Sequence, residues 1–265
     1  MGTITTFEDW ADEIRSAVPI LMYHKIGNRP NRSKTSWLYV SPGNFREMMA
    51  VATRARFQTV AMESVLQGQR GTTPRFVITF DDGYESVLKH AAECLREQGF
   101  TAIQFLVADR LGRLNEWDFG VDSATERLMD PTQVREWLAL GHEIGAHTLT
   151  HPRLSQIPLS RAREEIGSSK KKLEDLFGVP VSHFAYPYGD YNQEAVRLVQ
   201  EAGFQTACTT NSGCVQIGGD SFLLSRLTVR EREFPNWIAV KVRRRLRNFA
   251  RHGRPATEPA FRKSR

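Results

Sequence analysis

Two neighbouring carboxylates, Asp81 and Asp82, follow an apolar stretch of this chain and precede Gly83. The stretch, residues 77–80, is rich in β-branched and aromatic side chains, which predicts a buried strand that ends at the two acids. Gly83 permits a sharp turn out of that strand. Burying two like charges side by side is unfavourable unless hydrogen bonds, a counter-charge or a cation stabilise them. A bound metal ion would do so, and its other ligands are then expected elsewhere in the chain.

The candidate ligands are two histidines in the segment 145–151. His147 and His151 are four residues apart, so they share one face if the backbone makes a helical turn. With Asp82 they would form a site of two imidazoles and one carboxylate, which leaves coordination positions open for water and substrate. Such a site is typical of catalysis. The alternative is a pair of hydrogen-bonded histidines without a metal.

Three ordered motifs of the chain resemble the successive signatures of the polysaccharide deacetylases, carbohydrate esterase family four, the chitooligosaccharide deacetylase homology domain. They are Thr79-Phe80-Asp81-Asp82-Gly83, His147-Thr148-Leu149-Thr150-His151 and Phe184-Ala185-Tyr186-Pro187-Tyr188-Gly189. Three motifs in order are more specific than any one alone, and the resemblance extends from about Val18 to about Val229. It implies that Asp82, His147 and His151 hold the metal and that Asp81 is the general base.

The third motif closes a strand expected at residues 181–186. Pro187 fixes the backbone and Gly189 frees the next turn, a geometry suited to presenting the amide of Tyr188 to a reacting carbonyl. The resemblance implies that this amide and the metal form the oxyanion hole. Tyr186 and Pro187 are predicted to contact the substrate.

One departure from the family pattern concerns the partner of the catalytic aspartate. Many members have an arginine where this chain has Ala185, and that arginine orients the aspartate. We expect Arg226, in the final predicted strand, to supply the guanidinium instead. The alternative is that Arg226 pairs with an acid at the surface.

A second departure concerns the general acid, because no histidine follows His183 until His252. His24 is the predicted substitute. It ends a strand expected at residues 18–24, and active sites of parallel barrels collect at the C-terminal ends of the strands. Alternatively, Asp81 takes the proton from water and returns it to the leaving amine.

Strand and helix patterns alternate with short links, as in residues 77–80, 84–98 and 101–107, which predicts a parallel sheet. At 265 residues the chain can bury a full core as one domain. With the resemblance, the expected fold class is α/β, a distorted, incomplete (β/α) barrel of about seven parallel strands. The expected parts are an N-terminal extension (1–17), the barrel domain (18–229) and a basic amphipathic C-terminal tail (230–265).

A longer loop at residues 111–125 contains Trp117 and Asp118. An aromatic ring and a carboxylate at the barrel mouth could stack on a sugar and bind its hydroxyl groups. These two residues are therefore candidates for substrate binding. The alternative is that Trp117 covers the barrel and Asp118 caps a turn.

The tail differs from the rest in charge. From residue 229 onward it has twelve Lys or Arg against three acids, which gives +9. Apolar residues recur at helical spacing beside these charges, which predicts a peripheral contact with an anionic membrane. A helix packed on the barrel with a basic outer face is the alternative. No nucleic-acid binding is expected, since no motif for it accompanies the charge.

Cysteine number and the N-terminal residues bear on location. The three cysteines are odd in number and lack paired metal spacing, which favours a reducing compartment. The first ten residues carry acids where a signal peptide needs a basic start and an apolar run. We expect a cytoplasmic location, extending to the inner face of the membrane.

The expected function is metal-dependent hydrolysis of the N-acetyl group of an acetylated amino sugar in a polysaccharide, an oligosaccharide or a lipid-linked glycan. Zinc is the expected ion, with nickel, cobalt or iron as alternatives. Nothing resembles a Gly-x-Ser-x-Gly elbow, which counts against serine esterase chemistry. Two other functions stay open: hydrolysis of a non-carbohydrate, cyclic amide on the same fold, and glycan binding by a catalytically impaired homologue.

Overall fold

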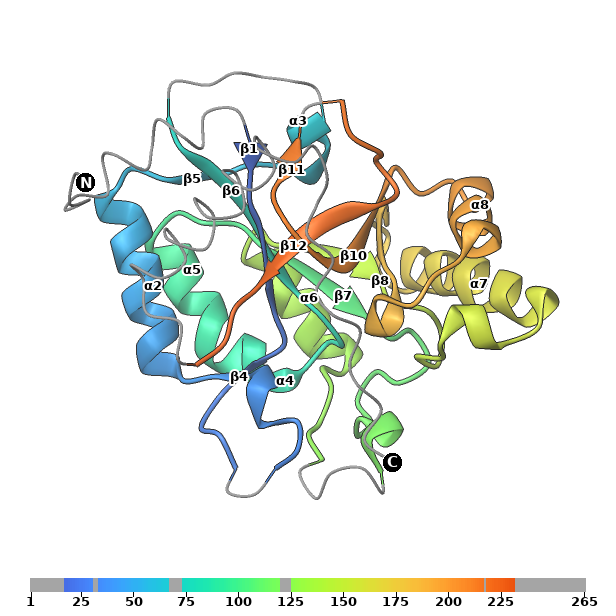
Figure 1. The fold of residues 1–265 in the computed structure, drawn as a ribbon. Helices are drawn as coiled ribbons and strands as arrows, with labels where there is room; N and C mark the ends of the chain where they lie inside the picture. Colours follow the sequence, from blue (N-terminus) through green and yellow to red (C-terminus); the bar gives the residue numbers. More distant parts are fainter. Residues whose placement is uncertain (1–16, 31–32, 67–72, 120–124, 217, 232–265) are drawn as a thin grey trace.

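Seven parallel strands close into a ring in the computed structural model (Figure 1). The structure describes residues 17–30, 33–66, 73–119, 125–216 and 218–231. The ring strands are β2 (Ile20–Tyr23), β6 (Arg75–Phe80), β7 (Ile103–Leu106), β8 (Glu143–Ala146), β9 (His183–Ala185), β10 (Thr206–Ser212) and β12 (Leu224–Thr228). The fold is thus α/β, a single-domain barrel of seven parallel strands, as predicted.

The ring closes through β2, which has a parallel partner on each side. Leu21 pairs with Ile78 of β6 on one side and with Leu227 of β12 on the other. Strands from the beginning and the end of the described chain therefore lie side by side. Both faces of β2 and β6 are covered, which explains why these two strands are largely apolar.

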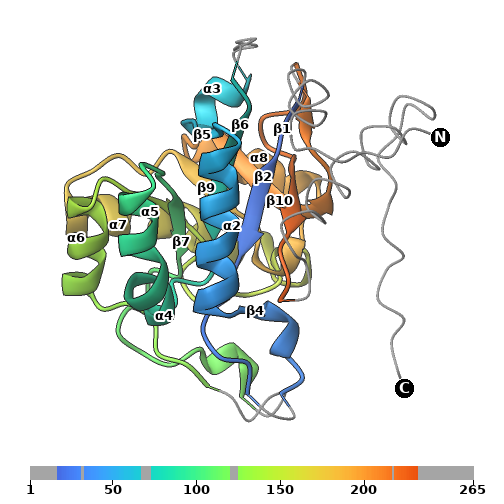
Figure 2. The same cartoon turned by 90° about the vertical axis from the view of Figure 1, so that its left-hand side faces the viewer.

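Helices surround the ring, as Figures 1 and 2 show from two directions. They are α2 (Pro42–Arg54), α3 (Met62–Leu66), α4 (Glu85–Val87), α5 (Glu93–Glu97), α6 (Pro131–Ala139), α7 (Leu159–Phe177) and α8 (Gln193–Glu201). The helix predicted at residues 84–98 is present as α4, the π-helical turn η2 (Leu88–Ala92) and α5 in direct succession.

Short strands and 3₁₀ turns complete the described chain. The strands are β1 (Ala17–Val18), β3 (Lys25–Ile26), β4 (Tyr39–Val40), β5 (Gln58–Thr59) and β11 (Val215–Gln216), and the turns are η1 (Ser36–Leu38), η3 (Glu116–Asp118), η4 (Leu154–Gln156) and η5 (Pro187–Gly189). The turns follow strands and lie near the ends that carry the candidate site.

Local capping fixes where the helices begin. The Ser41 hydroxyl accepts a hydrogen bond from the Asn44 amide at 3.4 Å, and proline follows at the first helical position of α2. Asp130 and Gln133 form a capping box at the start of α6. At the other end of α7, Gly178 adopts φ 67°, which a residue without Cβ allows at little cost.

The core between the ring and the helices is rich in aromatic rings. Tyr23 and Phe80 end the neighbouring strands β2 and β6, and their ring centroids are 5.4 Å apart. Phe45 of α2 packs edge-on against Tyr23, and Trp137 of α6 packs edge-on against Phe80. This packing fixes the ends of the two strands, directly before the residues that carry the candidate chemistry.

Several expectations concern residues beyond the described part. The predicted tail, apart from Arg230 and Glu231, and the N-terminal extension, apart from Ala17, lie outside the described residues. No helix in the described part combines the length and the hydrophobicity needed to cross a lipid bilayer.

Candidate functional site

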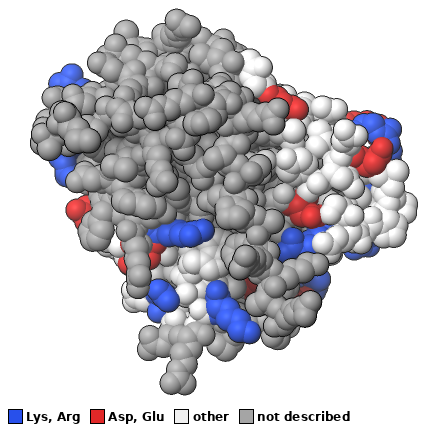
Figure 3. Space-filling view, viewed as in Figure 1, with Lys and Arg blue, Asp and Glu red and all other residues white. Residues whose placement is uncertain are grey.

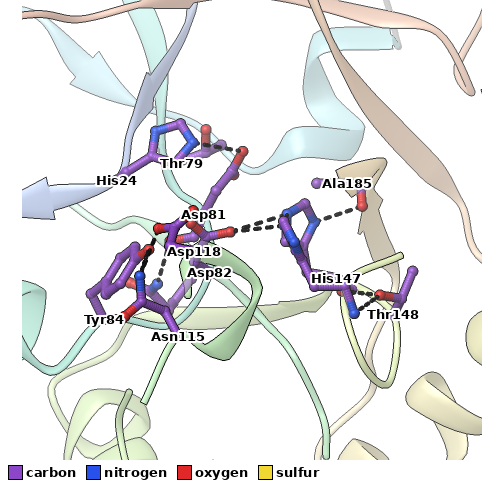
Figure 4. A network of polar contacts seen from close by, with 12 residues as sticks. His24, Thr79, Asp81, Asp82, Tyr84, Asn115, Asp118, His147, Thr148 and Ala185 are labelled. Carbon is purple, nitrogen blue, oxygen red and sulfur yellow. Dashed lines mark hydrogen bonds and ion pairs between the residues drawn. The ribbon is translucent and has the colours of Figure 1, made fainter. Parts of the chain in front are cut away.

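Three buried side chains meet where β6 and β8 end. The Asp82 Oδ1 atom lies 3.4 Å from His147 Nε2 and 3.2 Å from His151 Nε2. The two Nε2 atoms are 3.2 Å apart. Figure 4 shows Asp82 facing His147, with Asp81 beside it and His24 on the far side of Asp81. The structure therefore brings the three predicted metal ligands together, and their donor atoms could hold one metal ion.

The histidine pair is presented by a compact loop, whereas the sequence suggested a helical turn. Thr148 and His151 adopt left-handed φ values of 66° and 69°, and Asp82 has φ 73°. The Thr148 hydroxyl accepts a hydrogen bond from the His151 amide at 3.0 Å, which closes the loop. Non-glycine residues with positive φ are strained and cluster at functional sites. Here the strain lies at two of the three ligands.

A backbone carbonyl orients His147. The Nδ1 atom of His147 lies 2.7 Å from the carbonyl oxygen of Ala185, and since that oxygen only accepts, Nδ1 donates. Without a second proton on the ring, Nε2 presents a lone pair to the Asp82 carboxylate. Two facing acceptors repel each other unless a cation or a second proton lies between them. Two nitrogens and one carboxylate oxygen suit a divalent transition metal, so these residues fit the expected ion.

The Asp82 carboxylate is ionised in this environment. Burial alone raises its pKa, but the contacts with His147 and His151 outweigh burial and hold the pKa well below the ordinary value. The Tyr84 hydroxyl also hydrogen-bonds Asp82, and its own pKa is raised, first by burial and then by the acids nearby. Asp82 therefore carries a negative charge, and its partners His147, His151 and Tyr84 are all buried.

The second acid, Asp81, is held by an arginine fork. Arg226 donates from Nη1 to Asp81 Oδ1 and from Nη2 to Oδ2, both at 2.7 Å. Arg226 is completely buried and also donates to the Thr209 carbonyl oxygen at 2.9 Å and to the Thr79 hydroxyl at 3.1 Å. The structure thus places Arg226 against Asp81 and not against a surface acid. Arg226 thus makes the contact with the aspartate that was expected of it because position 185 is an alanine and not an arginine.

Arg226 also decides the charge of Asp81. Burial raises the pKa of Asp81, but the ion pair and hydrogen bonds with Arg226 outweigh burial and lower it. Asp81 is therefore a carboxylate with a fixed orientation, since a bidentate arginine constrains both of its oxygens. Such a group can accept a proton only from a donor placed against its free lone pairs.

His24 lies beside this ion pair. Its Nε2 atom is 3.9 Å from Asp81 Oδ2. Burial lowers the pKa of His24 below its ordinary value, more than the two nearby acids raise it. His24 is therefore neutral at neutral pH, and it lies at the same end of the ring as the acids. Its part in proton transfer stays a prediction.

Two aromatic rings enclose His151. Trp117 stacks on its imidazole with centroids 4.3 Å apart and planes inclined by 29°. Tyr188 approaches the same imidazole at 4.5 Å and 61°. The backbone of Tyr188 has φ 60° and ψ 7°, and 42% of the residue is exposed. Burial of part of the side chain raises the pKa of Tyr188 to about 12, so its hydroxyl stays protonated.

The remaining predicted substrate residues have different positions. Asp118 accepts a hydrogen bond from Asn115 Nδ2 at 2.7 Å, as expected of an acid that caps a turn. Tyr186 and Pro187 are buried, and the Tyr186 hydroxyl donates to the Phe222 carbonyl oxygen at 3.2 Å. Their burial argues against the predicted contact of these two side chains with substrate. They support the turn that presents Tyr188.

One residue of the site was missed in the sequence. Glu165 of α7 is completely buried. Its carboxylate accepts hydrogen bonds from the Leu149 amide at 2.9 Å, the Thr150 amide at 2.8 Å and the Thr150 hydroxyl at 2.6 Å. Glu165 therefore holds the backbone between the two histidines. Its spacing from the buried Ala162 and Ile166 is the signal that could have revealed it.

Glu165→Gln is expected to weaken metal binding about 10- to 100-fold, the usual effect of removing a partner that orients metal ligands. The glutamine oxygen can keep both backbone amides, but its NH2 group then replaces the oxygen that accepts from the Thr150 hydroxyl and from Arg161, so these two contacts are lost or reversed. Calorimetric titration with zinc or cobalt measures the affinity. Arg161→Gln is the matched control, because Arg161 donates to the same carboxylate at 2.7 Å from an exposed position. Equal metal affinity of Glu165→Gln and the unmodified protein would contradict the assigned role.

Comparisons with known proteins agree on one family. The family model described as polysaccharide deacetylase matches residues 68–207. YxkH of Bacillus subtilis, which carries the same family name, is 26% identical over 216 residues, 80% of this chain and 71% of that protein. The chitooligosaccharide deacetylase of Azorhizobium caulinodans is 33% identical over 130 residues, 48% of this chain. The match covers 54% of the length of this Azorhizobium protein.

A solved structure agrees with the fold. The Streptococcus pyogenes deacetylase PplD, determined in complex with acetate, superposes with a TM-score of 0.74. The match covers 85% of this chain and 98% of PplD at 22% sequence identity. The seven-stranded ring is therefore an architecture that an experimentally determined deacetylase shares.

Proposed function

Since the chain belongs to the polysaccharide deacetylase family, we propose that it removes N-acetyl groups from amino sugars of a glycan in a metal-dependent reaction that releases acetate. It is a hydrolase that acts on carbon–nitrogen bonds other than peptide bonds. The proposed substrates are polysaccharides, oligosaccharides or lipid-linked glycans with N-acetylated units. The observation that carries the proposal is the convergence of Asp82 Oδ1 with the Nε2 atoms of His147 and His151, beside an acid that is not part of this group.

The proposed cation site consists of Asp82, His147 and His151. A divalent ion bound there supplies Lewis acidity for the amide carbonyl and lowers the pKa of water at the site. Zinc is the proposed ion because two imidazoles and one carboxylate are a common catalytic zinc set, with nickel, cobalt or iron as alternatives. The loop held by Glu165 and the carbonyl of Ala185 keep both imidazoles aimed at Asp82.

Asp81 is the proposed general base. Its carboxylate accepts a proton from the attacking water while Arg226 keeps both carboxylate oxygens in place. The backbone amide of Tyr188 is the proposed donor to the oxygen that becomes negative as water adds to the carbonyl. The proton then passes to the leaving amine from Asp81 or through His24, whose Nε2 lies 3.9 Å from Asp81.

Product analysis tests the proposed reaction. The purified chain is incubated with N-acetylglucosamine oligomers and zinc or cobalt, and acetate and free amine are both measured. The expected result is release of the two products in equal amounts, since hydrolysis of one amide yields one of each. Metal binding with no acetate from any N-acetylated sugar would overturn the proposal. In that event, hydrolysis of a cyclic amide and glycan binding without turnover are the functions to test next.

A further inference from the structure

We propose that the substrate carries an anionic group, a phosphate or a carboxylate, next to its acetylated unit, and that Arg153 binds this group. The inference rests on the proposed deacetylase function and names the class of glycan that the site accepts. Arg153 lies two residues after His151, the end of the histidine loop, and is not one of the proposed metal ligands or acids. It is exposed, whereas the acids and metal ligands are buried.

Arg153 is the outermost member of a stack that begins at the metal ligands. Its guanidinium carbon lies 4.2 Å from the centroid of the Tyr188 ring. The Tyr188 ring in turn lies 4.5 Å from the His151 ring. A guanidinium is thus placed one aromatic ring away from the proposed cation site. A sugar whose acetamido group reaches that site would bring its neighbouring substituents within reach of Arg153.

The two segments that form this stack are joined to each other. Asp190, which follows η5, accepts hydrogen bonds from the amide and the hydroxyl of Ser155, both at 2.8 Å. Ser155 belongs to η4, directly after Arg153 in the chain. The link holds the backbone of the two segments together, and the guanidinium of Arg153 lies over the Tyr188 ring without any bound substrate. A cation held in its binding geometry loses less conformational entropy on binding than a free side chain does.

Within the described residues no acidic oxygen lies within 4.0 Å of the Arg153 guanidinium. Arg110 and Arg163 differ in this respect, since Arg110 pairs with Glu116 at 3.2 Å and Arg163 with Glu201 at 2.9 Å. The face of the Arg153 guanidinium rests on Tyr188, and its N–H edges remain for another acceptor. These edges match the two oxygens of a carboxylate or a phosphate.

A second arginine lies over an exposed aromatic ring on the other side of the acids. Arg230 is 5.5 Å from the Trp37 ring centroid, and 41% of Trp37 is exposed. Trp37 approaches the ring of His24 at 6.0 Å, and His24 is the neighbour of Asp81. In Figure 3, several Lys and Arg side chains lie on the lower part of the visible face, with a few Asp or Glu side chains among them. Arg153 and Arg230 thus each place a guanidinium over an exposed aromatic ring near the site.

The test compares N-acetylated sugars that differ in charge. A neutral N-acetylglucosamine oligomer, an oligomer in which N-acetylglucosamine alternates with glucuronate, and N-acetylglucosamine 1-phosphate are assayed with the unmodified protein, Arg153→Gln and Arg153→Lys. We expect a lower KM for one anionic sugar, which identifies carboxylate or phosphate as the group bound. Arg153→Gln should raise that KM about tenfold or more, since hydrogen bonds to charged groups contribute roughly 1.5–3 kcal/mol. Its kcat and its KM for the neutral oligomer should not change.

Arg96→Gln is the control, because Arg96 is equally exposed but lies on α5 and pairs with Glu93. Equilibrium binding of the same sugars to Asp81→Asn protein supplies a readout without turnover. Equal affinity for neutral and anionic sugars would overturn the inference while acetate release still supports the deacetylase function. Equal impairment on all sugars would also overturn it, because Arg153 would then only support Tyr188. Absence of both binding and acetate release with every sugar would count against both proposals.

Discussion

Asp82→Ala is expected to abolish zinc binding and to lower the rate of acetate release by about 10³-fold or more, because the metal contributes several kcal/mol to transition-state stabilisation. Asp82 Oδ1 faces both imidazoles, at 3.4 and 3.2 Å, and supplies the only negative charge of the three-residue donor set. Two neutral imidazoles alone retain little affinity for the ion. Metal content after dialysis and initial rates measure the two effects.

Asp109→Ala is the matched control for this change. Asp109 is also an acid that follows a ring strand, but it pairs with Lys172 at 2.8 Å on the surface. Its removal should leave metal content and rate unchanged. A chelator should reproduce the loss of activity in the unmodified protein, and added zinc should restore it. Full activity of metal-free protein, or a normal zinc content in Asp82→Ala, would contradict the proposed cation site.

Asp81→Asn is expected to lower kcat by about 10²- to 10⁴-fold, the usual contribution of general base catalysis. Metal binding should persist, because both Asp81 oxygens face Arg226 and neither is among the grouped donor atoms. This combination distinguishes a base from a ligand. Rates and zinc affinity measured on the same preparation provide the test. Loss of zinc together with loss of rate would move Asp81 into the ligand set.

The same substitution also affects stability. Arg226 is completely buried, and a buried charge that loses its partner costs about 3–5 kcal/mol. Asparagine retains one oxygen for the guanidinium, so the decrease in the free energy of unfolding should stay below that range. Chemical denaturation separates this effect from catalysis. A preparation that is folded and binds zinc yet has lost the rate supports the proposed base.

The grouping of the three candidate metal ligands could be predicted from the sequence because they lie within short motifs at strand ends. Asp82 is the second residue after β6, and His147 follows β8 directly. Parallel strands of a barrel place such ends on one side, so the grouping follows from the order of the motifs. The alternation of strands and helices likewise predicted a parallel sheet, and the resemblance to the family predicted that it forms a barrel. These features depend on local spacing, which a sequence displays.

Features that depend on burial or on exact backbone geometry were less accessible. The fold places Tyr186 and Pro187 inside the protein, where motif membership alone had suggested substrate contact. The buried role of Glu165 arises because α7 turns that residue toward the histidine loop. The carbonyl of Ala185 that orients His147 is a backbone atom, which side-chain patterns do not show. The contact between Arg226 and Asp81, in contrast, was expected from the sequence, although it spans 145 residues and needs the closed ring.

The distance in sequence between Asp81 and Arg226 has a consequence for the synthesis and folding of the protein. Asp81 directly follows β6, the second ring strand in the sequence, and its cationic partner lies on β12, the last ring strand. A nascent chain on the ribosome holds an acid without its counter-ion until residues 224–228 have emerged and joined β2. A fragment that ends after β10 lacks the strand that closes the ring, and it also lacks the guanidinium that pairs with the buried Asp81 carboxylate. The closed ring and the oriented Asp81 carboxylate therefore form together, when β12 pairs with β2.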